Sequence, residues 1–316
     1  QNGRTYSVDS MKKIFITGAT GFVGGRLAGL LGESMSEIEV RILSRKLHPI
    51  YETVICDFER ESVPSSAMVS IDTIFHLAGF THDLRNASGV EYLYRKINVD
   101  ATVELAELAV ASGVKRFVFV SSVKAGGSAL PGKCMTEFDQ GEPEGVYGKT
   151  KREAELKLLE IGRKSDMHVS IVRPSLIYGP GVKGNLRMML SGIQKGWFPP
   201  LPETHNRRSM IHVDDLIQAL LLVADNDCAN GSIFIATDGY PYSSREIYEA
   251  MCCMLEKSIP QWSVPKFFFD LVAAMSSHIR YKVDKLLGDE CYSSEKLQSI
   301  GFKAKRSLKD MNETFF

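Results

Sequence analysis

The sequence predicts an α/β fold with a doubly wound parallel sheet and a smaller C-terminal domain. Three observations support this prediction. Short apolar runs alternate with helical patterns up to residue 236, and a glycine-rich turn follows the first run. The chain of 316 residues is also long enough for one large domain or two unequal ones. Strands that alternate with helices pair in parallel, because each crossover returns the chain to the same edge of the sheet.

The elements of the first domain follow in order. Residues 14–17 are apolar and end at glycines, and Leu27, Leu30 and Leu31 then recur with helical spacing. The remaining predicted elements are strands at 40–43, 73–77, 116–120, 168–172 and 232–236, and helices at 99–111, 148–161 and 213–224.

The second half of the chain is less regular. Residues 178–206 are rich in Gly and Pro and contain Trp197, which predicts a lid or a substrate loop. We therefore assign 11–177, with 206–236 returning, to the first domain, and 178–205 and 237–316 to the second. The most apolar stretch, Phe267–Met275, is interrupted by Asp270 and is far shorter than the ~18 residues of a membrane span, so a buried or amphipathic helix is expected.

Composition narrows the functional classes. Lys plus Arg and Asp plus Glu both number 38, so the net charge favours neither nucleic acid nor an anionic membrane as the main partner. The six cysteines show no CxxC spacing, which predicts reduced residues, a reducing cytoplasmic location and no metal. Residues 1–10 are polar and precede Met11, so we expect a tail and no membrane insertion.

The glycine-rich turn predicts a dinucleotide site. Gly18, Gly21 and Gly24 lie between the first strand and the first helix, where backbone N–H groups and the helix dipole would hold a pyrophosphate. The spacing is GxxGxxG rather than GxGxxG. The predicted contacts of this turn are Gly18, Thr20, Gly21, Phe22, Val23 and Gly24.

The ends of the next strands bear on the choice of cofactor. The second strand ends at Ser44 and Arg45, and no carboxylate is present there to bind the ribose 2′-hydroxyl of NAD. An arginine at this place can instead bind the 2′-phosphate of NADP, so these two residues favour NADP. A solvated basic turn is the alternative. Asp57, followed by Phe58, could accept a hydrogen bond from the adenine amine, or could be an ordinary turn residue. The cofactor is therefore expected to be NAD or NADP.

A tyrosine and a lysine supply the predicted chemistry. Tyr147 and Lys151 are four residues apart at the start of a helix, so both side chains lie on one face. A free phenol has a pKa near 10, and lowering it by about three units takes roughly 4 kcal/mol, which an adjacent ammonium could supply. Ser122 ends an earlier strand, at the sheet edge where ligands bind, and could donate to a substrate oxygen.

Further motifs complete a family resemblance. They are His76-Leu-Ala-Gly79, Asn98-Val-Asp-Ala-Thr102, Arg173-Pro-Ser-Leu-Ile-Tyr-Gly-Pro180 and His212-Val-Asp-Asp-Leu216. With the glycine turn, Ser122 and the Tyr147/Lys151 pair, the chain from about Met11 to Phe302 resembles the extended short-chain dehydrogenase/reductases, and most closely their nucleotide-sugar epimerase/dehydratase branch.

The resemblance implies a Rossmann-like doubly wound sheet with a smaller C-terminal substrate-binding domain. It implies hydride transfer at a carbinol carbon, with Ser122, Tyr147 and Lys151 catalytic. It also implies a nucleoside-diphosphate sugar held by Asn185 and Arg208, and a homodimer formed through helices 99–111 and 150–161. The additional cofactor contacts it implies are Leu77, Ala78, Gly79, Asn98 and Pro174.

Three departures from the family pattern limit the chemistry. Leu176 stands where many relatives have asparagine, and Ala125-Gly126-Gly127 replaces Val-Tyr-Gly. Val123 and Lys124 occupy the places of the Asp-Glu pair of dehydratases, which argues against 4,6-dehydration. A 4-epimerase is the leading prediction. The alternatives are a 4-keto-sugar reductase, a reductase of another ketone such as a steroid or flavonoid, and a nonenzymatic cofactor sensor.

Overall fold

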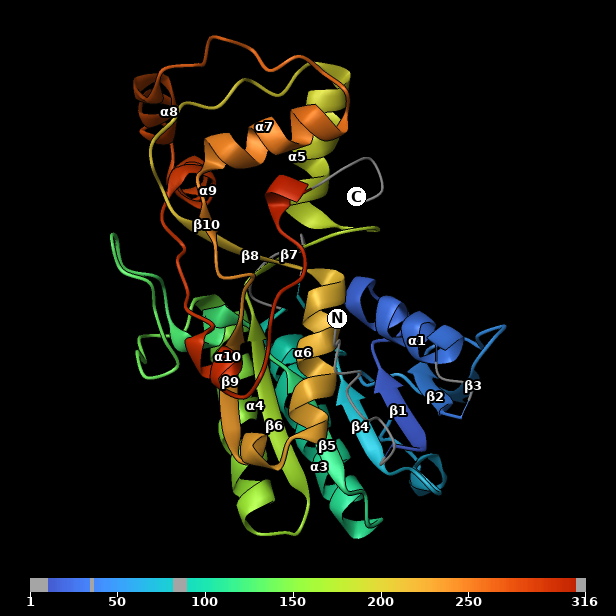
Figure 1. The fold of residues 1–316 in the computed structure, drawn as a ribbon. Helices are drawn as coiled ribbons and strands as arrows, with labels where there is room; N and C mark the ends of the chain where they lie inside the picture. The colour runs from blue at the N-terminus through green and yellow to red at the C-terminus, as the bar shows by residue number, and fades with distance from the viewer. Residues whose placement is uncertain (1–10, 35–36, 82–89, 311–316) are drawn as a thin grey trace.

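The computed structural model describes residues 11–34, 37–81 and 90–310, which form a larger and a smaller domain (Figure 1). The larger domain contains a seven-stranded sheet in the order β3-β2-β1-β4-β5-β6-β9, and every pairing is parallel. Its strands are β1 (Lys13–Thr17), β2 (Glu39–Ser44), β3 (Glu52–Ile55), β4 (Thr73–His76), β5 (Arg116–Val120), β6 (His168–Pro174) and β9 (Ser232–Ala236). The predicted sheet is confirmed.

Helices cover both faces of this sheet. On one face, α1 (Phe22–Ser34) and α6 (Val213–Asp225) bury an apolar stripe against the strands. On the other face, α3 (Ala101–Ala111) and α4 (Gly145–Arg163) do the same. The sheet is therefore doubly wound, as predicted.

Short helical segments connect these elements. They are η1 (Ser65–Met68), α2 (Glu91–Arg95), the π-helical turn η3 (Lys96–Asp100), η4 (Val123–Gly126) and η5 (Asp227–Ala229). The predicted helix at 99–111 thus begins within η3, and the predicted helix at 148–161 begins earlier, so that Tyr147 lies inside α4.

The smaller domain contains a three-stranded sheet, β10-β8-β7. Its strands are β7 (Leu176–Tyr178), β8 (Arg208–His212) and β10 (Pro241–Tyr242). Its helices are α5 (Gly184–Lys195), α7 (Ser244–Met254), α8 (Lys266–Ala273) and α9 (Ser277–Leu287). After them, α10 (Glu295–Ser299) packs Leu297 into the core shared with α1 and α6, and η6 (Leu308–Asp310) follows. The domain boundaries drawn from the sequence remain a prediction.

Residues 178–206 do not form the predicted loop, because α5 occupies their centre. Leu186, Met189, Leu190 and Ile193 have the i, i+3, i+4, i+7 spacing of one helix face, and all four are buried. Gly196 ends the helix in a left-handed conformation with φ of 78°. Glycines and prolines on either side of this short helix obscured its pattern.

The apolar stretch at 267–275 forms α8, but most of it is not buried. Only Phe269 and Ala273 pack toward the domain, while Phe267, Phe268 and Leu271 are exposed. The sequence shows that residues 267–275 are apolar but not which elements pack against them, so the exposure of these side chains could not be predicted. No helix in the described part of the chain is long and apolar enough to cross a membrane.

The prediction of six reduced cysteines is wrong, because Cys134 and Cys291 form a disulfide. The two residues are 157 positions apart, so no local spacing indicated the pair. They meet because Met135 and Tyr292 form a β-bridge between the loop after η4 and the segment after α9. The other four cysteines are free.

We predict that reduction of this disulfide destabilises the protein. Closing so long a loop restricts the unfolded chain, and native disulfides typically contribute about 2–4 kcal/mol. Urea unfolding with and without a phosphine reductant should show this loss, and a Cys134→Ser/Cys291→Ser variant should not respond to reductant. Six titratable thiols in the unreduced, denatured protein would contradict the pairing.

Candidate active site

The glycine turn packs so tightly that side chains are excluded at two positions. A Cβ at Gly24 would lie 2.2 Å from the carbonyl oxygen of Gly18. Gly18 has a φ of 74°, and a Cβ there would lie 2.7 Å from the backbone nitrogen of Ala78. Thr20 and Gly21 are exposed just before α1 begins at Phe22. The turn therefore presents open backbone at a helix N-terminus, which fits the pyrophosphate of a dinucleotide.

The turn lies at the topological switch point of the sheet. The chain continues from β1 to β2 and β3 on one side, and β4 pairs with the other side of β1. Ser44 ends β2, and Arg45 follows it, exposed. Asp57 follows β3, and its carboxylate accepts a hydrogen bond from the backbone of Glu59 at 3.1 Å. The predicted adenosine contacts thus gather at the carboxyl ends of adjacent strands, with Phe58 buried beside Asp57.

A buried histidine fixes the end of β4 beside this turn. His76 shares hydrogen bonds with the hydroxyls of Thr17 at 2.6 Å and Thr102 at 2.7 Å. Burial, reinforced by the charge of Lys151, lowers the pKa of His76 to about 3, so its ring is neutral. The Thr17 hydroxyl also accepts from the backbone of Ala78 at 3.1 Å. This network positions Leu77, Ala78 and Gly79.

Asn98 holds the segment after β4 against the catalytic helix. Its amide accepts from the backbone nitrogen of Phe80 at 2.7 Å and donates to the Phe80 carbonyl and to the Thr150 hydroxyl. A Cβ at Gly79 would lie 3.2 Å from the Lys151 ammonium. Asn98 therefore places this backbone beside Lys151, and its direct contact with a cofactor stays a prediction.

The three predicted catalytic residues converge. Ser122 lies two residues after the end of β5 and N-caps η4, while Tyr147 and Lys151 lie on the first turns of α4. The Ser122 hydroxyl lies close enough to the Tyr147 hydroxyl to favour ionisation of the phenol. Lys151 donates to the Val120 carbonyl at 3.0 Å, and its ammonium lies 5.9 Å from the centre of the Tyr147 ring. A serine, a phenol and an ammonium thus face the carboxyl edge of the sheet.

Burial controls the protonation of this site. It raises the pKa of Tyr147 to about 12, assisted by Tyr94 and opposed by the hydrogen bond from Ser122. It lowers the pKa of Lys151 to about 8, opposed by the charge of Glu155. At neutral pH the phenol is protonated and the lysine mostly charged, so Tyr147 becomes a base only when more positive charge is placed beside it.

We predict that Lys151 makes stability depend on pH. Its folded pKa of about 8 is below the ordinary 10.5, so between these values the unfolded chain binds more protons and stability rises with pH. The wild type should gain about 2 kcal/mol from pH 7.5 to 9.5 relative to Lys151→Met, as measured by urea unfolding. Parallel pH profiles for the two proteins would contradict the lowered pKa.

A buried ion pair under the site was not predicted. Arg173, on β6, binds Glu155 of α4 through two hydrogen bonds of 2.8 and 2.6 Å, and both side chains are at most 1% exposed. A Cβ at Gly126 would lie 2.7 Å from the guanidinium, so η4 rests directly on it. The pair links β6, which ends at Pro174, to the elements that carry Ser122 and Tyr147. The motif that begins at Arg173 was recognised in the sequence, but nothing in it indicated Glu155 as the partner.

The two predicted substrate residues lie on different elements of the smaller domain. Asn185 is exposed in the first turn of α5, and no hydrogen bond joins it to Arg208 in the described part of the structure. Arg208 begins β8, where its guanidinium binds Glu290 at 3.0 Å and donates to the Lys285 carbonyl.

A chain of charges connects Arg208 to the catalytic helix. Lys285 lies 2.6 Å from Glu290 and 2.7 Å from Glu144, the residue that precedes α4. Lys124, two residues after Ser122, lies 3.8 Å from the same Glu144 carboxylate. Sequence reasoning missed these contacts because they join four separate segments.

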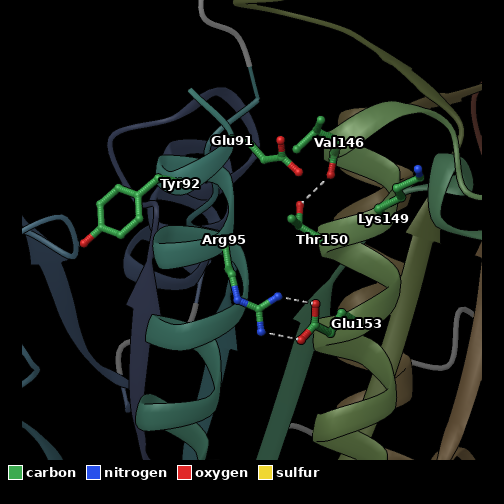
Figure 2. A pocket seen from close by; sticks show the side chains of 7 residues that line it. All are labelled: Glu91, Tyr92, Arg95, Val146, Lys149, Thr150 and Glu153. Carbon is green, nitrogen blue, oxygen red and sulfur yellow. Dashed lines mark hydrogen bonds and ion pairs between the residues drawn. The ribbon is translucent and has the colours of Figure 1, made fainter. Parts of the chain in front are cut away.

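A cavity of about 200 Å³ between α2 and α4 lies apart from this site (Figure 2). Arg95 and Glu153 form a two-hydrogen-bond ion pair across it, each bond 2.8 Å long. Its lining from α4 comes from the helix face that carries Val146, Lys149 and Glu153, not from Tyr147 and Lys151. We therefore do not assign it to the substrate.

The fold and the site together define the class of protein. A doubly wound sheet with an open glycine turn at its switch point binds a dinucleotide, and the Ser122, Tyr147 and Lys151 group lies at the same edge. This is an NAD-dependent enzyme of the short-chain dehydrogenase/reductase type.

The chain belongs to the NAD dependent epimerase/dehydratase family, whose model matches residues 14–236. It is 32% identical over 311 residues to UDP-glucose 4-epimerase of Vibrio cholerae, covering 95% of this chain and 93% of the relative. It is 26% identical to N-acetyl-alpha-D-glucosaminyl-diphospho-ditrans,octacis-undecaprenol 4-epimerase of Escherichia coli O157:H7, covering 93% and 91%. The structure of MoeE5 in complex with UDP-glucose and NAD superposes with a TM-score of 0.74 at 24% identity, covering 94% and 95%, and shows the same fold.

Proposed function

We propose that this protein is an NAD-dependent nucleotide-sugar 4-epimerase. The observation that carries the proposal is the convergence of Ser122, Tyr147 and Lys151 beside a backbone cradle suited to a dinucleotide. Similarity to two 4-epimerases across more than nine-tenths of the chain supports inversion at a sugar C4. Val123 and Lys124, in place of an acidic pair, argue against dehydration.

Each residue has a distinct role in the proposed reaction. Bound NAD supplies a hydride acceptor and a positive ring. Tyr147 takes the proton of the C4 hydroxyl and later returns it, while the Lys151 ammonium stabilises the phenolate. Ser122 donates a hydrogen bond to the same substrate oxygen. Between the two half-reactions the 4-keto sugar would rotate, so that hydride returns to its other face.

Arg208 is the proposed diphosphate contact, with Asn185 near the phosphate. An arginine suits this task because its planar guanidinium can meet two phosphate oxygens at once. In the structure Glu290 occupies that guanidinium. We therefore infer that the diphosphate replaces Glu290 as the partner of Arg208, while Lys285 retains its carboxylate partner in Glu144.

Two measurements test the proposal. They are the NAD content of the purified protein and its turnover when no cofactor is added. Mass spectrometry of the denatured, purified protein should find NAD at near-equal stoichiometry. Incubation with UDP-glucose or UDP-N-acetylglucosamine, with no cofactor added, should yield the C4-inverted sugar. Tyr147→Phe, purified in parallel, should retain NAD and yield no product. Absence of C4 inversion with either sugar, in protein that holds NAD, would argue against the proposal.

A 4-keto-sugar reductase is the second candidate, and Arg45 favours it. Arg45 is exposed at the carboxyl end of β2, where a 2′-phosphate of NADP would lie. A reductase must exchange its cofactor at each turnover, so it should be purified empty and should consume NADPH. Arg45→Asp would then weaken NADPH selectively over NADH.

Dimerisation through α3 and α4 is part of the proposal. Leu156 is 56% exposed and lies three residues after Glu153, on the same face of α4. We predict that Leu156→Glu converts a dimer to a monomer in light scattering. Leu130→Glu, equally exposed at 53% in the loop after η4, should leave the dimer intact. A monomeric wild type would contradict the prediction.

The cytoplasmic location remains a prediction. The Cys134–Cys291 disulfide removes the support that reduced cysteines would have given it, because such bonds persist in oxidising compartments.

A further inference from the structure

The outer side of α8 is a broad apolar surface. Phe267 and Leu271 lie one turn apart on this side and are 60% and 63% exposed, and Met275, two residues after the helix ends, is 75% exposed. Phe268 and Val272 widen this surface on the adjacent side of the helix. We call these five residues the α8 patch. Exposed apolar residues scattered singly are ordinary, but a contiguous aromatic and aliphatic face marks a surface that contacts something other than water.

The patch lies at the end of the smaller domain far from the seven-stranded sheet (Figure 1). The loop before α8 is tied to the end of α5, since Lys257 donates to the carbonyls of Ile193 and Gln194. The same loop is tied to the segment after α5, since the Val264 nitrogen donates to the Pro200 carbonyl. These hydrogen bonds bring the ends of two helices and two exposed tryptophans, Trp197 and Trp262, to one end of the molecule.

Cations gather in the same segments. Residues 193–200, at the end of α5 that is tied to this loop, contain Lys195 and no acid. Residues 256–282 contain four cations and two acids, and one of those acids, Asp270, is paired with Lys266 at 3.2 Å. The four are Lys257, Lys266, Arg280 and Lys282. The whole chain has equal numbers of acidic and basic residues, so its neutral total conceals a basic, apolar end.

We propose that the α8 patch docks this protein onto an anionic lipid bilayer. An exposed helix with large apolar side chains, flanked by lysine and arginine, lies in the headgroup region with its apolar side inserted and its cations near lipid phosphates. The basic charge favours an anionic membrane over a second copy of the chain, because two like-charged ends would repel each other.

Docking would orient the active site relative to the bilayer. Beneath α8, α9 contacts the catalytic helix, since Lys285 lies 2.7 Å from Glu144. The α8–α9 pair thus links the membrane-facing end of the domain to the residue three positions before Tyr147. One short structural unit would therefore join the bilayer surface to the proposed active site.

Vesicle flotation tests the proposal on the full-length protein. The wild type should float with phosphatidylcholine vesicles that contain phosphatidylglycerol, and salt should weaken this binding. Phe267→Ser/Leu271→Ser should lower the vesicle partition coefficient at least roughly tenfold, because apolar area is lost from the interface. Arg280→Glu/Lys282→Glu should lose binding to the anionic vesicles selectively.

A matched control uses apolar residues elsewhere. Leu47→Ser/Ile50→Ser removes two residues that are 74% and 76% exposed in the larger domain, and vesicle binding should not change. Thermal melts should show that every variant is folded, since all the substituted side chains are exposed. Failure of the wild type to float, or equal flotation of Phe267→Ser/Leu271→Ser, would overturn the proposal. So would a change in oligomeric state by light scattering in that variant without any vesicle binding, which would identify the patch as a subunit interface.

Discussion

Replacing Tyr147 by phenylalanine should reduce turnover by roughly 10²–10⁴-fold or more while the protein still binds NAD. The substitution removes only the hydroxyl, and the ring keeps its place beside Tyr94 at 6.4 Å between ring centres. No other phenol is positioned above Lys151 in the described structure, where that ammonium also contacts Phe119. Steady-state rates with the sugar substrate measure the loss.

The pH dependence of the same reaction gives a second readout. Burial raises the pKa of Tyr147 to about 12, so the positive charge of bound NAD would have to lower it for the phenol to act near neutrality. Ultraviolet titration should show phenolate forming at lower pH when NAD is added, and Tyr147→Phe should lack this change. Full activity in Tyr147→Phe would rule out the proposed acid/base role.

Arg173→Met and Glu155→Ala should each destabilise the protein by about 3–5 kcal/mol, because each leaves one charge buried without its partner. Both side chains are essentially inaccessible to water, and the pair lies between β6 and the catalytic helix. Urea unfolding measures the effect. Activity should also fall, because the guanidinium supports the turn that follows Ser122.

Two comparisons distinguish the cost of an unpaired buried charge from the ordinary loss of a side chain. Arg95→Met removes an ion pair of similar geometry that joins α2 to Glu153 of α4, but the Arg95 side chain is 52% exposed, so the cost should be at most about 1 kcal/mol. The double variant Arg173→Met/Glu155→Leu should be more stable than either single variant, since it leaves no buried charge unpaired. Equal effects of Arg173→Met and Arg95→Met would show that the buried pair has no special cost.

Local patterns in the sequence were sufficient to predict most of the larger domain. The strand at 116–120 and the strand at 232–236 match β5 and β9 residue for residue. A strand in a parallel sheet is a short apolar run, and its helix repeats apolar residues along one face, so both signals lie within a few neighbouring positions. The glycine turn and the Tyr147/Lys151 pair could be recognised for the same reason, because each is a local motif with a fixed spacing.

Other features depended on residues that are distant in the chain. The Cys134–Cys291 disulfide, the Arg173–Glu155 pair and the charges from Arg208 to Glu144 each join separate segments, and no local spacing encodes them. The exposure of α8 likewise depends on the absence of a covering element, which no property of residues 266–273 records. The sequence by itself determined the doubly wound sheet and the catalytic group, because local propensity and motif spacing specify them. Only the tertiary structure decided which charges are buried together and which apolar face meets the solvent, because those properties arise when remote segments pack.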